Sequence, residues 1–278
     1  MDLPFNAEGL DFRKLERSYL SAGTSAMVYL THLSGGAKVI LKSPHKFPRR
    51  DKLTESLEKE SSACLKREIE VLRHLGSHPH IIHFIAACGD ELLLEYHPKG
   101  CLTQYLGIEP RPSTPLVLSW ATQLAEALVF IHNKDVIHGD FSPHNVLVTD
   151  QRALVLTDFA GSPFRGLAGL VCYGTRYTSP KYNPDSPQKQ DDIFAFGSVL
   201  YEISFWKCLF PEITPEDEWR IREAYKAGEF PDVSAHVLGN IINHCWREPE
   251  TAEVLLNHIC DLAVDGHESL NFECRREI

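Results

Sequence analysis

The fold of this chain is decided by residues 136–161, which read VIHGDFSPHNVLVTDQRALVLTDFAG. The stretch begins with a short apolar run and continues into a polar loop. Asp140 and Asn145 stand five positions apart in this loop, and Pro143 between them keeps the loop out of a regular helix. A carboxylate and an amide are therefore held close together in a non-helical segment.

The second half of the stretch predicts a β-hairpin. Residues 146–148 and 153–156 are apolar runs joined by four polar residues. The hairpin returns the chain to Asp158, so the side chains of Asp140, Asn145 and Asp158 can converge on one place. Oxygen ligands of this kind suit a hard cation such as Mg²⁺. A plain polar loop between two strands would explain one aspartate, but it explains the ordered combination poorly.

The same residues resemble the catalytic core of eukaryotic-type protein kinases. His138-Gly139-Asp140 takes the place of the H-R-D motif, Asn145 that of its closing asparagine, and Asp158-Phe159-Ala160-Gly161 that of D-F-G. The resemblance implies an α+β, bilobal protein-kinase-like fold, in which a small β-rich N-lobe carries one main helix and a larger C-lobe is mostly helical. It also implies a single kinase domain over residues 1–278, with the N-lobe at about 1–97 and the C-lobe at about 98–278.

A glycine-poor version of the kinase phosphate-binding loop precedes this core. Against the family pattern G-x-G-x-x-G-x-V the chain has Ser21, Gly23, Ala26 and Val28, within a predicted strand–turn–strand over residues 18–30. Small side chains at these positions still let backbone N–H groups approach phosphates. The match is weak by itself and gains its weight from its place in the order of motifs.

A predicted strand at residues 37–42 ends in the lysine that the resemblance assigns to the nucleotide phosphates, Lys42. Glu68 is its expected ion-pair partner, on a helix that apolar residues at helical spacing predict over residues 63–75. Ile40 replaces the alanine of the family motif, so we expect it to crowd the adenine site.

Residues 92–97 resemble the hinge between the two kinase lobes. The resemblance makes Leu94 the gatekeeper, and its bulk predicts a small back pocket. It also assigns backbone hydrogen bonds with adenine to Glu95 and His97, and a further nucleotide contact to Leu147.

Three other segments frame these motifs. Residues 1–17 are expected to pack on the N-lobe. Residues 43–62 form a charged stretch that is longer than kinases usually carry, and we expect a mobile loop or an extra helical turn there. Residues 116–132 are a strongly apolar predicted helix that leads into the catalytic loop.

Two motifs of the C-lobe complete the resemblance. Residues 174–181 resemble G-T-x-x-Y-x-A-P-E, one residue short, and residues 191–202 resemble D-x-W-S-x-G-x-x-x-x-E closely. The second match is the most specific sign of a protein-kinase C-lobe. The resemblance also implies a stack of side chains that couples the lobes, made of Leu72, Phe84, Phe159, His138 and Asp192.

The catalytic loop departs from the family at three positions. Gly139 replaces the arginine that pairs with an activation-segment phosphate, so we expect the segment to be ordered in another way. Ser142 replaces the lysine that supports the transferred phosphate in serine/threonine kinases, and His144 stands where tyrosine kinases carry arginine. Charge stabilisation should therefore be weaker, and the usual marker of the acceptor type is missing.

The activation segment, which follows Gly161 and runs to about Pro180, also departs from the family, as does the residue after it. Lys181 replaces a glutamate, which predicts a charge-swapped ion pair with Glu248 or Glu250. Thr175 is expected to bond Asp140, as the equivalent threonine does in serine/threonine kinases. The other hydroxyl groups of the segment, Tyr173 among them, are interpreted as ordinary loop polarity.

Ala160 replaces the glycine of D-F-G and stiffens the turn after Asp158. Gly161, the next residue, is expected to supply the lost conformational freedom.

These features predict an ATP- and Mg²⁺-dependent protein kinase that phosphorylates serine or threonine hydroxyls of protein substrates. Asp140 would accept the hydroxyl proton, Asn145 and Asp158 would hold metal, and Lys42, fixed by Glu68, would position phosphates.

One alternative is a small-molecule phosphotransferase, because H-G-D-x-x-x-x-N is the aminoglycoside and choline kinase form. Those families lack the C-lobe motifs described above. A second alternative is a pseudokinase scaffold, against which the retained lysine, glutamate, base and metal ligands count.

Composition agrees with a globular domain of 278 residues, 43% of them hydrophobic and 24% charged. A net charge of −10 gives no support to nucleic-acid or anionic-membrane binding. No apolar run is expected to reach membrane-spanning length, and the first residues do not resemble a signal peptide.

The eight cysteines show no C-x-x-C pair, so we expect reduced thiols and a cytoplasmic or nuclear location. The 14 histidines form no zinc pattern and are interpreted as structural.

Overall fold

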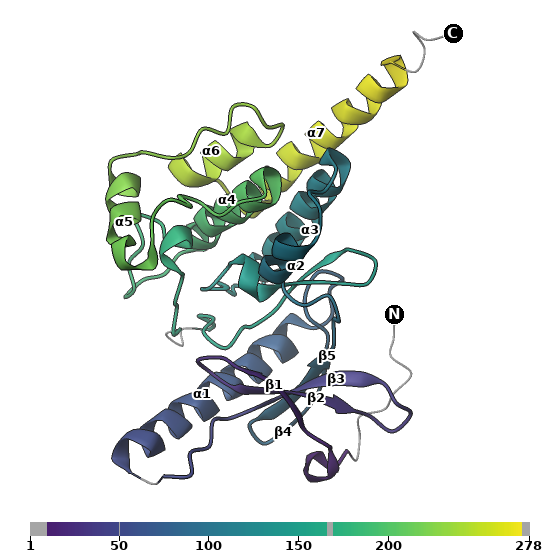
Figure 1. The fold of residues 1–278 in the computed structure, drawn as a ribbon, viewed down its shortest axis with the longest axis vertical. Coiled ribbons are helices and arrows are strands. Elements are labelled where there is room, and N and C mark those ends of the chain that lie inside the picture. Colours follow the sequence, from purple (N-terminus) through teal and green to yellow (C-terminus); the bar gives the residue numbers. More distant parts are fainter. Residues whose placement is uncertain (1–9, 50, 166–168, 274–278) are drawn as a thin grey trace.

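The computed structural model of the chain describes residues 10–49, 51–165 and 169–273. It consists of two lobes, a β-rich N-lobe beside helix α1 and a larger helical C-lobe (Figure 1). The predicted α+β, bilobal fold is confirmed.

The N-lobe is built on a five-stranded antiparallel sheet in the order β1-β2-β3-β5-β4. Its strands are β1 (Ser18–Ala22), β2 (Met27–His32), β3 (Lys38–Ser43), β4 (Phe84–Cys88) and β5 (Glu91–Glu95). The strand–turn–strand predicted from residues 18–30 is therefore confirmed as β1 and β2.

Strand β3 shows how the sequence places Lys42. Successive side chains of a strand point to opposite faces of the sheet. Val39 and Leu41 are buried with Phe12 in a small cluster on one face. Ile40 lies on the other face and packs against the main core of the protein. Lys42, two residues after Ile40, therefore points to the same side, toward helix α1. Phe12 also confirms the packing expected of the N-terminal segment for residues 10–17; residues 1–9 lie outside the described part.

Helix α1 (Lys52–Leu75) is longer than predicted, with 24 residues. Asp51 and Thr54 form a capping box that begins it, with reciprocal hydrogen bonds of 3.0 Å. The interpretation of residues 43–62 as a mobile loop or a single extra turn is wrong, because residues 52–62 form about three turns of helix. Their only large apolar side chains, Leu53 and Leu57, are exposed, so no buried apolar stripe marks these turns in the sequence.

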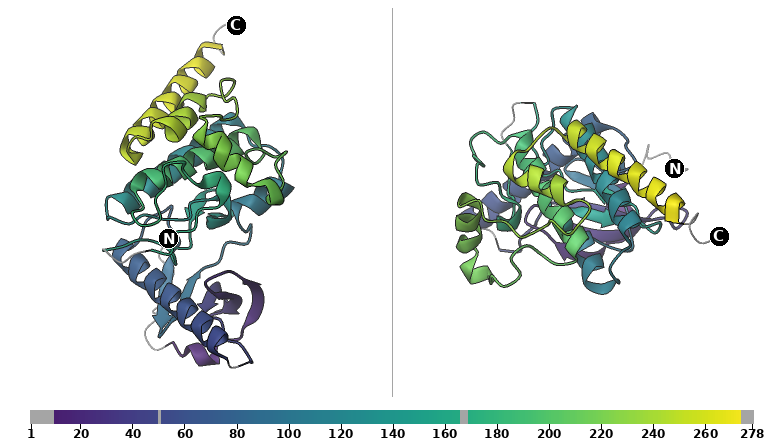
Figure 2. Two further views of the ribbon diagram at one scale, coloured as in Figure 1. Left: turned by 90° about the vertical axis from the view of Figure 1, so that its left-hand side faces the viewer. Right: turned by 90° about the horizontal axis from the view of Figure 1, so that it is seen from above.

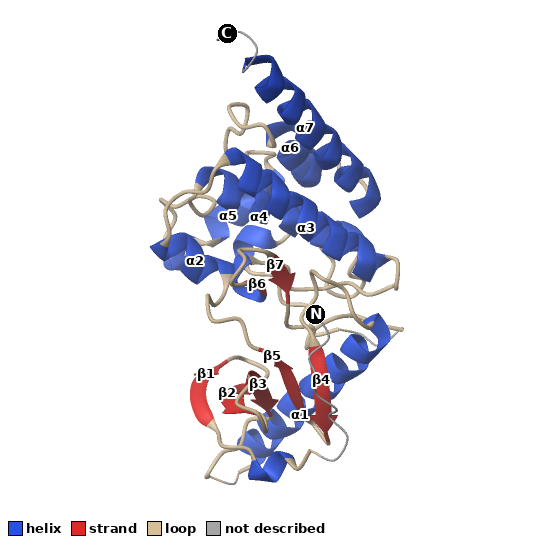
Figure 3. Cartoon of the chain, turned by 90° about the vertical axis from the view of Figure 1, so that its right-hand side faces the viewer, coloured by secondary structure: helices blue, strands red, loops and turns tan. Residues whose placement is uncertain are grey.

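The C-lobe contains the predicted hairpin and six helices among the described residues. These are α2 (Leu102–Ile108), α3 (Thr114–His132), β6 (Val146–Val148), β7 (Leu154–Leu156), α4 (Lys189–Phe205), α5 (Trp219–Lys226), α6 (Gly239–Arg247) and α7 (Ala252–Glu273). The hairpin of β6 and β7 lies on the side of the C-lobe that faces the N-lobe (Figure 3), whereas α7 lies at the far end from the sheet (Figure 2).

Helix α4 is the centre of the C-lobe, because every residue from Asp191 to Ser204 is buried. It packs against α3 and α6. Asp191 and Asp192 stand in its first turn, where carboxylates favour the positive end of the helix dipole.

Helix α3 corrects one expectation. With 19 residues and a mean hydropathy of 1.4, it is the one helix in the described ranges that is long and apolar enough to cross a membrane. Trp120, Leu124 and Leu128 on it are fully buried, and it packs against α4, α7 and β7. Its apolar character is thus explained by the core of the C-lobe.

The crossing of α4 and α6 predicts a cost for any side chain at Gly197. A Cβ atom there would collide with Cβ of Cys245. We expect Gly197→Ala to lower the free energy of unfolding by about 1–3 kcal/mol, because a close-packed helix pair must separate. Gly107→Ala is the matched control, since nothing lies within 4 Å of its added Cβ; it should be neutral or stabilise by up to about 1 kcal/mol. Urea unfolding of the two variants measures both values, and equal effects would contradict the packing argument.

Candidate active site

A buried ammonium group joins the two lobes. Lys42 Nζ lies 2.8 Å and 2.9 Å from the two carboxylate oxygens of Glu68 on α1, and 3.0 Å from Oδ1 of Asp158, which follows β7. Glu68 is fully buried, and the backbone N–H of Phe159 also donates to it. The predicted pair of Lys42 with Glu68 is therefore present, and Asp158 joins it.

The opposite charges of Lys42 and Asp158 stabilise each other's ionised form. Burial disfavours the lysine cation, but the carboxylates of Asp158 and Glu68 outweigh that cost, so the pKa of Lys42 is raised. Burial likewise acts to raise the pKa of Asp158, yet the nearby Lys42 ammonium holds that pKa below its ordinary value. Lys42 and Asp158 are thus charged at neutral pH.

The turn that begins at Asp158 keeps the acidic side chain in place through its backbone. Asp158 has a φ of +66°, a left-handed conformation that is uncommon for a residue with a side chain. Phe159 is fully buried and its ring meets His138 edge-on, with ring centroids 5.0 Å apart.

Asp140 and Asn145 lie together in the catalytic loop, as predicted. Asn145 Nδ2 donates to Oδ2 and to the backbone oxygen of Asp140, both at 2.8 Å, so its Oδ1 is left for another partner. A short 3₁₀ turn over Pro143–Asn145 brings the two residues together. The backbone N–H of Thr157 donates to the backbone oxygen of Asn145 at 2.9 Å, which holds the residue before Asp158 beside Asn145.

Burial raises the pKa of the Asp140 carboxyl to about 7, against the opposing effect of the Asn145 hydrogen bond. The negative charge of Asp158 raises it further, whereas His144 acts in the opposite direction. A carboxyl with a pKa near neutrality can accept and return a proton under ordinary conditions.

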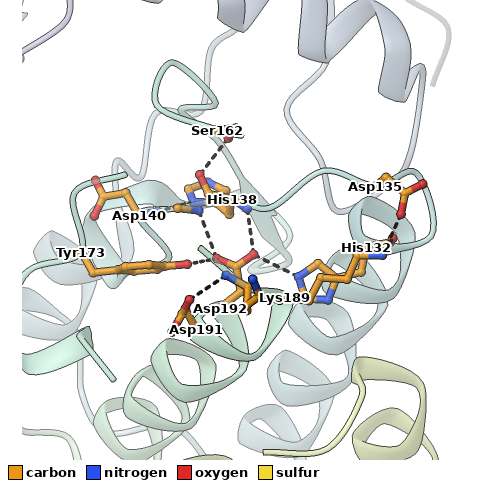
Figure 4. A network of polar contacts seen from close by, with 11 residues as sticks. His132, Asp135, His138, Asp140, Ser162, Tyr173, Lys189, Asp191 and Asp192 are labelled. Carbon is orange, nitrogen blue, oxygen red and sulfur yellow. Dashed lines mark hydrogen bonds and ion pairs between the residues drawn. The ribbon is translucent and has the colours of Figure 1, made fainter. Parts of the chain in front are cut away.

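The backbone of the catalytic loop is fixed from below by α4. Asp192 accepts hydrogen bonds from the backbone N–H groups of His138 (2.7 Å) and Gly139 (3.1 Å), as Figure 4 shows. His138 accepts at Nδ1 from the N–H of Asp140 and bonds the Thr157 oxygen through Nε2. These contacts orient the residues on both sides of Asp140.

The loop between β1 and β2 is tied down at its tip. Gly23 N–H donates to the Ala26 oxygen at 2.9 Å, which closes a tight turn. The Ser61 hydroxyl on α1 donates to the Ser25 oxygen at 2.7 Å, and His45 Nε2 lies 2.9 Å from the Gly23 oxygen. The sequence did not indicate Ser61 or His45, because Ser61 lies on the turns of α1 that were not predicted, and His45 is attached to these turns by its backbone N–H, which donates to the Ser61 hydroxyl.

The other residues expected to hold the nucleotide lie on or beside the N-lobe sheet and on β6. Ser21 and Val28 are paired across β1 and β2, and Ala26 is buried. Leu94 is buried on β5 beside Ile40 of β3, and Leu147 forms a bridge with Cys101 at the start of α2.

Some backbone groups of the hinge already form hydrogen bonds within the protein. The Glu95 N–H donates to the His83 oxygen and the His97 oxygen accepts from Gly100, both at 3.1 Å. In the part of the chain that the structure describes, the His97 N–H makes no hydrogen bond. It is therefore a donor that an adenine ring could use.

The stack of side chains that the sequence implied is present in part as direct contacts. Leu72, Phe84 and Phe159 all belong to the main hydrophobic core. His138 contacts the Phe159 ring and donates its backbone N–H to Asp192. Direct contacts are therefore established from Phe159 through His138 to Asp192 on α4, while Leu72 and Phe84 share the core with Phe159.

A cavity of about 390 Å³ lies between the β1–β2 loop, α1 and the activation segment. Its lining includes Asp140, Asp158, Thr24, Ser25, Leu57 and Leu170. The two carboxylates are thus accessible from one cavity.

The residues around Asp158 fit a hard divalent cation only in part. Asp158 supplies a carboxylate and Asn145 an amide oxygen, which are ligands that Mg²⁺ accepts. Within the described ranges, no group of three or more His, Cys, Asp or Glu side chains is placed to hold a metal by itself. Such a donor set fits an ion that completes its coordination with phosphate oxygens and water.

Comparison with known proteins identifies the family. The model for protein tyrosine and serine/threonine kinases matches residues 17–260. The chain belongs to this protein kinase family.

Individual kinases are distant relatives. Serine/threonine/tyrosine-protein kinase HT1 of Arabidopsis thaliana is 28% identical over 76% of this chain and 55% of its own length. Aurora/IPL1-related protein kinase 2 of Caenorhabditis elegans is 32% identical over 60% of this chain and 55% of its own length. Probable serine/threonine-protein kinase gdt2 of Dictyostelium discoideum is 25% identical over 86% of this chain and 15% of its own length. The chain thus spans about half, or less, of the relatives that it matches.

Two expectations for the activation segment of this kinase are wrong. Thr175 donates to Glu218 at 2.8 Å and not to Asp140, and Arg176 pairs with the same carboxylate at 2.8 Å. The segment is one residue shorter than the family pattern, and Thr175 and Arg176 both bond Glu218, at the start of α5. Lys181 is exposed and makes no ion pair among the described residues, so the charge-swapped pair is absent.

The expected role of Gly161 is also wrong. The positive φ lies at Asp158, and Gly161 has no positive φ. A Cβ at Gly161 would stand 2.7 Å from the backbone oxygen of Leu170, so glycine is needed for the close approach of the activation segment. Ala160 is buried without any need for glycine.

The buried pair predicts how the N-lobe responds to loss of its cation. Lys42→Met should lower the free energy of unfolding by about 3–5 kcal/mol, because Glu68 is left buried without a cation. The double variant Lys42→Met with Glu68→Gln should recover most of this loss, since the amide can still accept from Phe159 and carries no charge. Chemical denaturation at pH 7.5 measures wild type, the two single variants Lys42→Met and Glu68→Gln, and the double variant. If the free-energy changes of the two single variants add up to that of the double variant, the predicted coupling between Lys42 and Glu68 is contradicted.

Proposed function

We propose that this kinase transfers the γ-phosphate of ATP, with Mg²⁺, to serine or threonine hydroxyls of protein substrates. The observation that carries the proposal is the contact of Lys42 with both Glu68 and Asp158, beside a cavity that Asp140 also lines. Positioning and charge neutralisation are what phosphoryl transfer requires from a protein.

Asp140 is the proposed base. Its carboxylate is held by Asn145, and its pKa of about 7 lets it take the acceptor proton at neutral pH. Lys42, fixed by Glu68, would hold phosphate oxygens. His144 carries a raised pKa, chiefly because of its hydrogen bond with Cys101, so it can add positive charge near Asp140 where Ser142 replaces lysine.

Asn145 and Asp158 are the residues that would hold Mg²⁺. A bound Mg²⁺ would supply neutralisation of phosphate charge. Proposed nucleotide contacts come from the β1–β2 loop, β3, the hinge and β6, through Ser21, Gly23, Ala26, Val28, Ile40, Leu94, Glu95, His97 and Leu147. The free N–H of His97 supports the hinge part of this assignment.

The finer assignments rest on the relatives and on composition. One of the relatives described above is named a probable serine/threonine-protein kinase and another a serine/threonine/tyrosine-protein kinase, which supports serine or threonine as acceptor. We assign residues 1–97 and 98–278 to the lobes of one kinase domain. A cytoplasmic or nuclear location is proposed from the cysteine pattern, and the seven described cysteines are free.

Phosphoryl transfer tests the proposal directly. The protein is incubated with γ-labelled ATP and Mg²⁺, and with peptides that offer only Ser, Thr or Tyr, or with small alcohols. Asp140→Asn should slow transfer at least about 100-fold, the usual contribution of a general base, and Asp158→Asn should abolish metal-dependent transfer. Asp261→Asn, an exposed carboxylate on α7, is the matched control and should keep full activity.

The acceptor arms distinguish the alternatives. Labelled Ser or Thr peptides, lost in both variants, support the proposal. Label on small alcohols alone would make the protein a small-molecule phosphotransferase. Nucleotide binding without any transfer would make it a scaffold.

The raised pKa of Asp140 predicts a pH dependence. The base acts as a carboxylate, and its pKa is about 7. The ionised fraction rises from about one tenth at pH 6 to about nine tenths at pH 8, so kcat/KM should rise about tenfold over this interval. The residual rate of Asp140→Asn should lack this rise. A flat wild-type profile between pH 6 and 8 would show that Asp140 is not the base.

A further inference from the structure

A fully buried carboxylate lies beneath the catalytic loop without a lysine or arginine partner among the described residues. Asp192 instead receives four hydrogen bonds (Figure 4). Two come from the backbone of His138 and Gly139, one from His132 Nε2 at 3.0 Å, and one from the Tyr173 hydroxyl at 2.6 Å. A buried carboxylate depends on all its hydrogen-bond donors, because water no longer solvates its charge.

Tyr173 is the donor that comes from outside the catalytic loop and its supporting helices. It belongs to the activation segment, and only 8% of its surface is exposed. Burial and the nearby Asp192 charge raise the pKa of its hydroxyl well above the ordinary value, so the hydroxyl keeps its proton and donates. The interpretation of this hydroxyl as loop polarity is therefore wrong.

The two residues before Tyr173 hold the same loop. The Cys172 N–H donates to the Gly139 oxygen at 3.0 Å. Gly139 has a φ of +80°, and a Cβ at this position would stand 3.1 Å from Cγ2 of Val171 and 3.4 Å from Cδ of Pro163. The activation segment thus occupies the space that a side chain at position 139 would need.

The beginning of the activation segment is attached to the same loop. The Ser162 hydroxyl donates to the His138 oxygen at 2.8 Å, and Phe164 forms a strand-like bridge with Val136. Residues 162–164 and 171–173 therefore both contact residues 136–139. These contacts are made by backbone groups and by the Ser162 hydroxyl.

We propose that Tyr173 is a positioning residue that orders the activation segment, and through Asp192 the backbone around Asp140, without phosphorylation of the segment. The hydroxyl bond to Asp192 and the glycine at position 139 together replace an arginine–phosphate contact. This inference rests on the proposed kinase function, and its test keeps the two apart.

The test compares two tyrosine variants of the full chain. Tyr173→Phe removes the hydroxyl and keeps the ring. Tyr182→Phe is the matched control, because this half-buried ring packs edge-on against Tyr173 at 5.7 Å and no hydrogen bond of its hydroxyl is found among the described residues. Each protein is treated with phosphatase until its intact mass shows no phosphate. The readouts are kcat and KM for ATP with a Ser/Thr peptide mixture, and amide hydrogen exchange of residues 136–142 and 169–180.

We expect unphosphorylated wild type to be as active as the autophosphorylated protein. Tyr173→Phe should lower kcat about tenfold with KM for ATP within about twofold, and should speed exchange in both segments. Tyr182→Phe should match the wild type in kcat, in KM for ATP and in hydrogen exchange. If weaker packing between the two tyrosine rings were the only cause, both variants would lose activity and KM for ATP would also rise.

Wild type that needs phosphate for activity, or a Tyr173→Phe protein that matches Tyr182→Phe in kcat and exchange, would overturn the inference. If no protein transfers phosphate, the proposed function fails. In that case faster exchange in Tyr173→Phe alone would still establish the hydroxyl as the group that orders the segment, and equal exchange would refute it.

Discussion

The position of the Lys42 ammonium is the constraint on which the two lobes of this kinase depend. It lies between the carboxylate of Glu68, carried by α1, and that of Asp158, which follows β7. The Glu68 side chain is fully buried and depends on the cation, whereas the Asp158 side chain is 36% exposed and also contacts solvent. A strand of the sheet, the long helix and the turn after the hairpin are therefore fixed relative to one another by one charged group.

The C-lobe contains a second buried carboxylate, Asp192, which has no lysine or arginine partner in the part of the chain that the structure describes. Asp192 is buried in the first turn of α4 and is satisfied by hydrogen bonds from the catalytic loop, α3 and the activation segment. Hydrogen bonds to a charged acceptor are stronger than those between neutral groups. The carboxylate can for this reason assemble three segments that are distant in sequence, and Asp140 gains its orientation from the backbone that Asp192 holds.

The sequence predicted the parts of this structure that short motifs encode. Asp140 with Asn145, the hairpin to Asp158, and the pair of Lys42 with Glu68 follow from residue types at fixed spacing. The extra turns of α1 were missed because their apolar residues are exposed. Thr175 was misplaced because the activation segment is one residue short, and only the folded chain shows that Glu218 is its partner. Tyr173 gave no signal, since a hydroxyl that bonds a buried carboxylate looks like any loop tyrosine.

The hydrogen bonds of Ser61 and His45 give the β1–β2 loop a mechanical link to α1. Ser61 stands two turns before Glu68 on the same helix and holds the Ser25 oxygen, while its own oxygen accepts from the His45 N–H. Lifting the tip must either break these bonds or pull the helix, and with the helix the carboxylate that holds Lys42. The position of the β1–β2 loop and the integrity of the charged group at Lys42 are therefore coupled through one helix.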